Sequence, residues 1–166
     1  MAPSLAEHIS DWLESESNAA VDALTTSPEE SFAAILDYGG AYPDGMDPRD
    51  AHGIYLVNLL SLLVSRVPEL LANRELKTIP VRKRYIVVNA AITADATVFR
   101  DFILGGLRDR SIYIKTLVLD AIVRHPVLRT PTAHAMVKRL LTVKSIAESD
   151  YDRRHVEAAL ETFPTV

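Results

Sequence analysis

The sequence predicts an all-α fold in which antiparallel helical hairpins stack as a short α-solenoid. Apolar residues recur at helical spacing along most of the chain, and hairpin signals such as an Asn-Gly turn between alternating apolar residues are absent. Proline directly follows a capping side chain at several predicted helix starts. The connections are short, which favours antiparallel packing of neighbouring helices. An irregular compact helical bundle is the alternative architecture.

Two short helices are predicted before residue 27. Ser4 can cap the first, which carries Leu5, Ile9, Trp12 and Leu13 on one face. The polar stretch 15–18 is expected to end that helix. Residues 19–24 are expected to form a further turn or two.

Two later helix starts combine a capping side chain with a proline. Ser27 and Asp47 each stand directly before a proline. The capping oxygen accepts a bond from an amide that is otherwise unpaired, and proline has no amide to leave unpaired. Ser27 and Asp47 are therefore predicted to be structural residues. The first of these helices should end at the glycine pair 39–40 and the second at about Val67, with one long loop, residues 39–47, between them.

Six further helices are predicted from residue 68 onward. Short connections and prolines separate them. Val98, Phe99, Phe102 and Ile103 are expected to face inward on the third of them. The approximate ranges are a short helix from Pro68, then 80–92, 95–107, 111–124, 130–143 and 149–163.

Composition indicates one domain over residues 1–166. Hydrophobic residues make up 48% of the 166 residues, and no cysteine is present, which excludes disulfides and thiolate metal sites. No apolar run approaches the roughly 20 residues that cross a bilayer. The first ten residues lack the basic region and apolar stretch of a signal peptide. We therefore expect a cytoplasmic protein with no membrane partner.

The charges are distributed unevenly. Residues 1–50 hold eleven acidic side chains and one basic side chain, whereas residues 51–166 hold eleven acidic and seventeen basic ones. On this basis the domain is divided into acidic N-terminal helices, 1–47, and a helical-hairpin stack, 48–166. Such polarity can steer a charged partner toward one end, and it can also arise from solvated helix faces that differ by chance.

Residues 99–125, FRDFILGGLRDRSIYIKTLVLDAIVRH, are the clearest internal unit. Asp109 follows the first amphipathic helix, and the hydrophobic-basic pair Ile114-Lys115 opens the second. This pattern resembles the HEAT repeat. The resemblance implies an α-solenoid in which Asp109 and Lys115 form a structural pair. Weaker echoes, YIVVNAAI and RRHVEAAL, extend the resemblance over residues 68–163.

Local catalytic and metal-binding motifs are not found. None of the five histidines lies within four residues of another, and no phosphate-binding glycine loop or nucleophile elbow occurs. His155 follows Asp152 by three residues, a spacing that can place two metal ligands on one helix face and more commonly gives a surface pair. We therefore predict no enzyme, no catalytic or metal residues and no cofactor.

The leading functional hypothesis is a protein–protein interaction module. Solenoids present extended, rigid surfaces to partners. Polar positions on the second helices of the hairpins, Asn89, Thr116, Asp120 and Arg124, are the candidate contact residues. A small HEAT-like adaptor or inhibitor fits the acidic composition, and a bacterial immunity protein that blocks a toxin is a narrower form of this hypothesis. The identity of the partner and the oligomeric state stay open.

The alternative is nucleic-acid binding through a basic stripe on the C-terminal helices. Its residues are Arg82, Lys83, Arg84, Lys115, Arg153 and Arg154. HEAT-like proteins that repair DNA make the idea reasonable. The net charge of −4 and the scarcity of aromatic side chains among these residues argue against it.

Overall fold

The computed structural model describes residues 1–39 and 51–165, and every regular element within these ranges is helical. Eleven α-helices and four short 3₁₀ helices make up this part of the chain, so the predicted all-α class is confirmed. The chain divides into two compact units, Met1–Asp95 and Ala96–Val166. Within the described ranges, none of the helices has both the length and the apolar character needed to cross a membrane.

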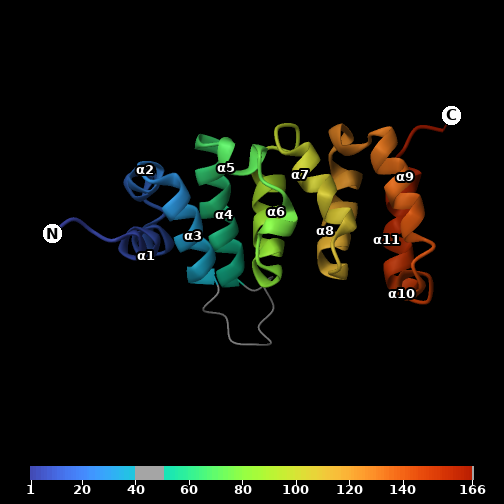
Figure 1. The fold of residues 1–166 in the computed structure, drawn as a ribbon, viewed down its shortest axis with the longest axis horizontal. Helices are drawn as coiled ribbons and strands as arrows, with labels where there is room; N and C mark the ends of the chain where they lie inside the picture. The colour runs from blue at the N-terminus through green and yellow to red at the C-terminus, as the bar shows by residue number, and fades with distance from the viewer. Residues whose placement is uncertain (40–50, 166) are drawn as a thin grey trace. The chain divides into compact units, whose positions relative to one another are not determined.

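In its described residues, 1–39 and 51–95, the first unit contains six α-helices and two 3₁₀ helices (Figure 1). They are α1 (Leu5–Ser15), α2 (Asn18–Thr25), α3 (Pro28–Gly39), α4 (Ala51–Arg66), α5 (Glu69–Ala72), η1 (Leu76–Thr78), η2 (Val81–Lys83) and α6 (Arg84–Ala94). The predicted cap is present at the start of α1, where Ser4 and Glu7 form a reciprocal capping box. Asp47 and most of the predicted long loop lie outside the described residues.

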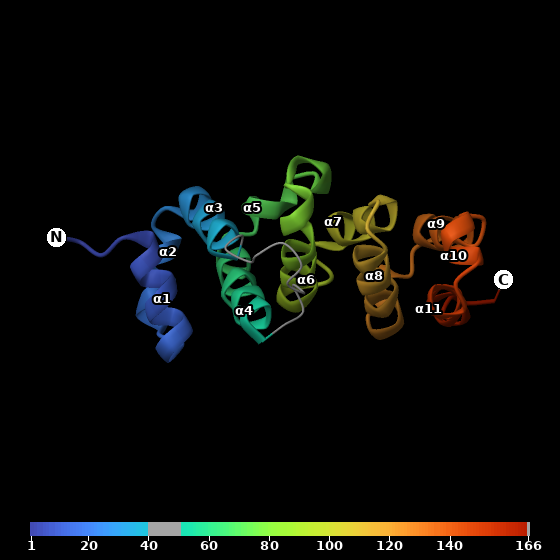
Figure 2. The ribbon, with the colours of Figure 1, turned by 90° about the horizontal axis from the view of Figure 1, so that it is seen from below.

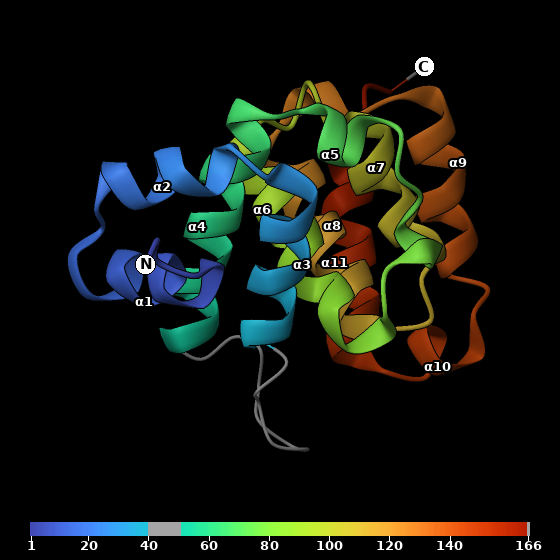
Figure 3. The same ribbon diagram turned by 60° about the vertical axis from the view of Figure 1, so that its left-hand side comes forward.

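Helix α4 is the centre of the first unit. It packs against α1, α2, α3, α5 and α6, and Figure 3 shows α1 and α2 beside it. A helix with neighbours on several sides must be apolar on several faces. The α4 sequence meets this demand with six buried side chains, Leu56, Val57, Leu59, Leu60, Leu63 and Val64.

Three ion pairs join the acidic helices α2 and α3 to bases that follow 44 to 46 residues later in the chain. The pairs are Asp22 with Arg66, Glu29 with Arg74 at 2.7 Å, and Asp37 with Lys83 at 2.5 Å. Arg74 also lies over the ring of Phe32, 4.4 Å from its centroid. The carboxylates are exposed, so each pair stabilises the fold by only about 0–1 kcal/mol. The pairs do neutralise part of the acidic charge concentrated in residues 1–50.

The second unit contains five α-helices and two 3₁₀ helices. They are α7 (Arg100–Gly105), η3 (Gly106–Arg108), α8 (Ile112–Arg124), η4 (Pro126–Leu128), α9 (Pro131–Leu140), α10 (Lys144–Ala147) and α11 (Asp150–Glu161). Helix α8 packs against η3, η4 and α11, and Figure 2 shows α9, α10 and α11 grouped together. Thr130 caps α9, which the sequence predicts to begin at this residue, because its hydroxyl oxygen accepts a bond from the Ala133 amide at 3.0 Å.

The glycine pair 105–106 has a packing role in the second unit. A Cβ atom on Gly106 would lie 2.7 Å from Val118 Cγ2 and 3.1 Å from Ile114 Cγ2, both on α8. Gly105 has no such neighbour within 4 Å. The close approach of η3 to α8 therefore depends on the missing side chain at Gly106 alone.

The predicted helix over 95–107 was wrong at its start. Residues 96–99 form a turn, and α7 begins only at Arg100. Asp95 is the C-cap of α6 in an extended conformation, which separates the two helices. Val98 consequently does not face inward and is 54% exposed, whereas Phe99, Phe102 and Ile103 are buried as predicted.

The capping box predicts a perturbed titration of Glu7. The Ser4 backbone amide donates to the Glu7 carboxylate at 2.5 Å, and this bond and the Ser4 hydroxyl hold the pKa of Glu7 below its ordinary value. Carbon-detected NMR titration should show this lowered pKa, and Ser4→Ala should raise it part of the way. Because the folded-state pKa is lowered, the stabilisation exists above the unfolded-state pKa and is lost as the pH falls through the folded-state value. An ordinary pKa for Glu7 in the native protein would contradict the capping box.

The two glycines should respond oppositely to alanine. Gly106→Ala should destabilise the protein by about 1–3 kcal/mol, because the new methyl group overlaps the α8 side chains. Gly105→Ala should be neutral or stabilising by up to about 1 kcal/mol, since alanine favours the helix. Urea unfolding followed by circular dichroism measures both. Equal free energies of unfolding for the two variants would show that η3 does not pack against α8 in this way.

Candidate functional site on α8 and α11

Three of the four predicted contact residues share one face of α8. Thr116, Asp120 and Arg124 follow each other at four-residue intervals on this helix. Asp120 and Arg124 are exposed and Thr116 is half-buried. The fourth residue, Asn89, is half-buried on α6 in the first unit.

The opposite face of α8 fixes this arrangement. Ile114, Val118, Ala121 and Ile122 are at most 1% exposed and form the core of the second unit together with the side chains of its other helices. Burial of these side chains sets the rotation of α8 about its axis. The polar stripe on the other side is therefore held in a defined direction by the packing beneath it.

A hollow of about 530 Å³ lies between the C-terminal half of α8 and the middle of α11. Apolar surface comes from Val123 and Ala158, and charges come from Asp120, Arg124 and Arg154. His155 completes the lining. The structure thus brings two predicted contact residues, Asp120 and Arg124, together with Arg154, which the sequence had suggested for the basic stripe.

His155 links the hollow to an exposed tyrosine. Its Nδ1 atom is 2.9 Å from the Tyr151 carbonyl oxygen, which can only accept a hydrogen bond, so Nδ1 carries the proton. The other nitrogen, Nε2, is 3.9 Å from Asp120 Oδ1 on α8. The His155 and Tyr151 rings lie 4.5 Å apart between centroids, and Tyr151 is 67% exposed. Tyr151 therefore places an exposed aromatic ring against His155, one of the residues that line the hollow.

We call the combined area the α8/α11 surface. It consists of Thr116, Asp120, Val123, Arg124, Tyr151, Arg154, His155 and Ala158. The sequence pattern associates His155 with Asp152 and gives no indication for Tyr151. The residue spacing in α11 could have predicted this shared face. Tyr151, His155 and Ala158 follow at intervals of four and three residues, so they lie on one side of the helix. Val156 and Ala159 are the buried positions of the same helix.

The basic cluster 82–84 is largely bound to neighbouring protein groups in the first unit. Lys83 pairs with Asp37, and Arg84 donates to the carbonyl oxygens of Ile79 at 2.7 Å and Lys77 at 3.1 Å. Arg82 is exposed.

The remaining stripe residues belong to the second unit. Arg153 is engaged on its own helix with Asp150 at 2.7 Å and Glu157 at 3.6 Å. Lys115 is half-buried and Arg154 is exposed. Arg154 lines the hollow beside Asp120 and Arg124.

Two of the predicted structural residues, Ser27 and Asp109, stand before helices. Asp109 is 7% exposed, and its Oδ1 accepts a bond from the Ser111 amide at 2.9 Å, directly before α8. Its pairing with Lys115 stays a prediction. Ser27 stands immediately before α3, and its carbonyl oxygen accepts a bond from the Ser31 amide at 2.9 Å. The capping bond of the Ser27 side chain also stays a prediction.

The groups that line the α8/α11 surface are suited to recognition of another molecule. They combine exposed cations, a carboxylate, an aromatic ring and apolar surface. In the described ranges, no three or more histidine, aspartate or glutamate side chains gather in a way that could hold a metal ion.

Comparisons with known proteins add no family. No protein-family model matches the chain, and searches of curated proteins and of solved structures find no match. The resemblance to the HEAT repeat therefore rests on the residue pattern, and the all-helical architecture is compatible with a helical repeat fold.

Proposed function

We propose that the chain is a protein-interaction module that binds a partner through the α8/α11 surface and acts as a small adaptor or inhibitor rather than as an enzyme. The observation that supports this most directly is the hollow of about 530 Å³ lined by Arg124, Arg154 and His155, whose ring contacts the exposed ring of Tyr151. Tyrosine and arginine beside a hollow are the side chains that contribute most to protein interfaces.

The rigidity of the surface favours binding. Its α8 residues are held by a buried helix face, and the Tyr151 ring contacts the ring of the half-buried His155. A surface that is ordered before binding loses little conformational entropy when the partner arrives. The HEAT-like interpretation of residues 99–125 agrees with such a surface. In it, α7 and η3 form the first helix of a hairpin, Asp109 starts the second, and α8 presents the outer stripe.

The charge distribution favours a protein partner over nucleic acid. Lys83 and Arg153 are in ion pairs and Arg84 is bonded to backbone carbonyls, so three members of the proposed basic stripe are already engaged with the protein. Phosphate neutralisation by those residues would require these bonds to be exchanged. Nucleic-acid binding is accordingly the weaker proposal.

The immunity-protein version needs acidic side chains that can reach a basic toxin. Asp22, Glu29 and Asp37 are paired within the first unit. The exposed carboxylates of α1 and its C-cap, Asp11, Glu14 and Glu16, are then the more suitable contact groups for this version. Substitutions on α1 would test it separately from those on α8 and α11.

A pull-down with matched variants tests the main proposal. The tagged protein is used as bait in a lysate of the native host, and bound proteins are quantified by mass spectrometry. We expect one partner to be retained by the wild type and lost from Arg124→Glu/Arg154→Glu. It should be retained by the control Lys138→Glu/Arg139→Glu, which reverses two exposed charges on α9. Circular dichroism should show the same helical content in all three proteins.

Three outcomes would contradict the proposal. The first is that no stable partner is recovered. The second is that Arg124→Glu/Arg154→Glu retains the partner as well as the wild type does. The third is that the wild type binds an immobilised DNA or RNA column and that this binding falls steeply as the salt concentration rises. The last result would support the nucleic-acid alternative instead.

A further inference from the structure

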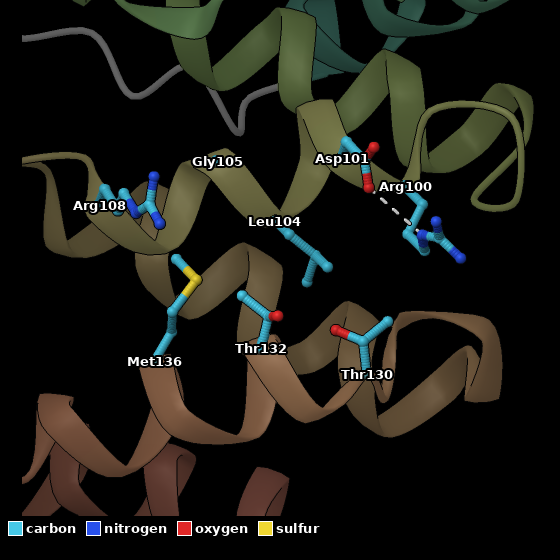
Figure 4. Close-up of a pocket in the computed structure, with 8 residues that line it drawn as sticks. All are labelled: Arg100, Asp101, Leu104, Gly105, Arg108, Thr130, Thr132 and Met136. Carbon is cyan, nitrogen blue, oxygen red and sulfur yellow. Dashed lines mark hydrogen bonds and ion pairs between the residues drawn. The ribbon is translucent and has the colours of Figure 1, made fainter.

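A second hollow, of about 330 Å³, lies between α7 with η3 on one side and the start of α9 on the other, within the second unit (Figure 4). It is lined by Arg100, Asp101, Leu104, Gly105, Arg108, Thr130, Thr132 and Met136. None of these residues lines the α8/α11 hollow. The two hollows can therefore be tested independently.

The positive charges stand at the two ends of this hollow. Figure 4 shows Arg100 and Arg108 at opposite ends, with Leu104 between them and Met136, Thr132 and Thr130 along the other wall. Both arginines are exposed. The hollow thus has a cationic end, an apolar middle and a second cationic end.

The two cations differ in their neighbours. Arg100 Nε is 3.3 Å from Asp101 Oδ1, and both side chains are well exposed. No ion pair involves Arg108 in the described part of the chain. Asp101 therefore weakens the positive potential at one end of the hollow, while the other end keeps its full charge.

The spacing of these groups matches an extended peptide. Arg100 and Leu104 lie on α7, which rises about 1.5 Å per residue, and Arg108 ends η3, which rises about 2.0 Å per residue, so the two arginines are about 13 Å apart along the chain axis. An extended chain covers about 13 Å in four residues, and its side chains at alternate positions point to the same side. Two carboxylates four residues apart, with an apolar side chain midway, would meet Arg108, Leu104 and Arg100 in turn.

We propose that this hollow binds an extended acidic segment of another protein with the pattern acidic–x–apolar–x–acidic. The two carboxylates pair with Arg100 and Arg108, and the apolar side chain packs against Leu104 and Met136. The exposed Thr132 hydroxyl is placed to bond to the peptide backbone. This is a site in addition to the α8/α11 surface and does not require that surface to bind a partner.

A defined peptide tests the inference on the full chain. The probe is the fluorescein-labelled peptide Gly-Glu-Thr-Leu-Thr-Glu-Gly, and its binding is measured by fluorescence anisotropy at low salt. We expect Arg100→Gln and Arg108→Gln each to weaken binding about two- to fivefold, the size of one exposed charge pair. Asp101→Asn should strengthen binding by a similar factor. Arg110→Gln is the matched control, because Arg110 is exposed in the same segment and does not line the hollow.

The spacing of the acids is tested by the peptide itself. Replacement of both glutamates by glutamine should weaken binding about 4- to 25-fold, the product of the two charge pairs. A peptide with the two glutamates adjacent should also bind more weakly than the probe. No binding of the probe, or equal binding of the adjacent-acid peptide, would overturn the inference. An equal loss in Arg110→Gln would also overturn it, since that result indicates unspecific charge attraction. Unchanged binding by Arg124→Glu/Arg154→Glu would support the assignment to this hollow rather than to the α8/α11 surface.

Discussion

The burial of one face of α8 is the interaction on which the second unit depends. Four apolar side chains on that face, Ile114, Val118, Ala121 and Ile122, are at most 1% exposed. Full burial of a valine or isoleucine contributes about 1.5–3 kcal/mol as an upper estimate, which exceeds the contribution of any exposed ion pair in the protein. The missing side chain at Gly106 lets η3 approach this face closely. A helix anchored in this way on one side must present a defined stripe on the other, and the proposed binding surface is built on that stripe.

Charge plays a different part in the two units. The sequence suggests a strongly acidic end available to a partner, but three of its carboxylates are paired with bases more than forty residues away, on or after α4. These pairs are individually weak. Their effect is to reduce the charge that α2 and α3 present to solvent. The arginines at the two hollows of the second unit, by contrast, stand at exposed positions beside apolar surface, where they are suited to recognition.

Local signals predicted most of the helices, and tertiary contacts explain what was missed. Ser4 and Thr130 act as caps because capping involves residues three apart, which a sequence displays directly. The sequence did not predict the turn before α7, because the apolar residues around Val98 keep helical spacing even though helix α6 ends at Asp95. His155 and Asp120 lie close together on two different helices. Local sequence patterns do not show which helices pack against each other, so this contact could not be predicted. Helical phase did predict that Asp120 and Arg124 face outward together, whereas the hollow beside them required the position of α11.

Amide hydrogen exchange measured by mass spectrometry is the most direct test of the central claim, that α8 is the anchored helix of the second unit. We expect peptides from Ile112–Arg124 to exchange slowest in that unit, at rates limited by its cooperative unfolding, and peptides from the short α10, Lys144–Ala147, to exchange much faster. The slowly exchanging amides should include those of the solvent-facing α8 residues, because the whole helix is expected to open in one cooperative step. Exchange in α8 as fast as in α10 would contradict the claim, since a helix that opens freely cannot hold a binding surface in place.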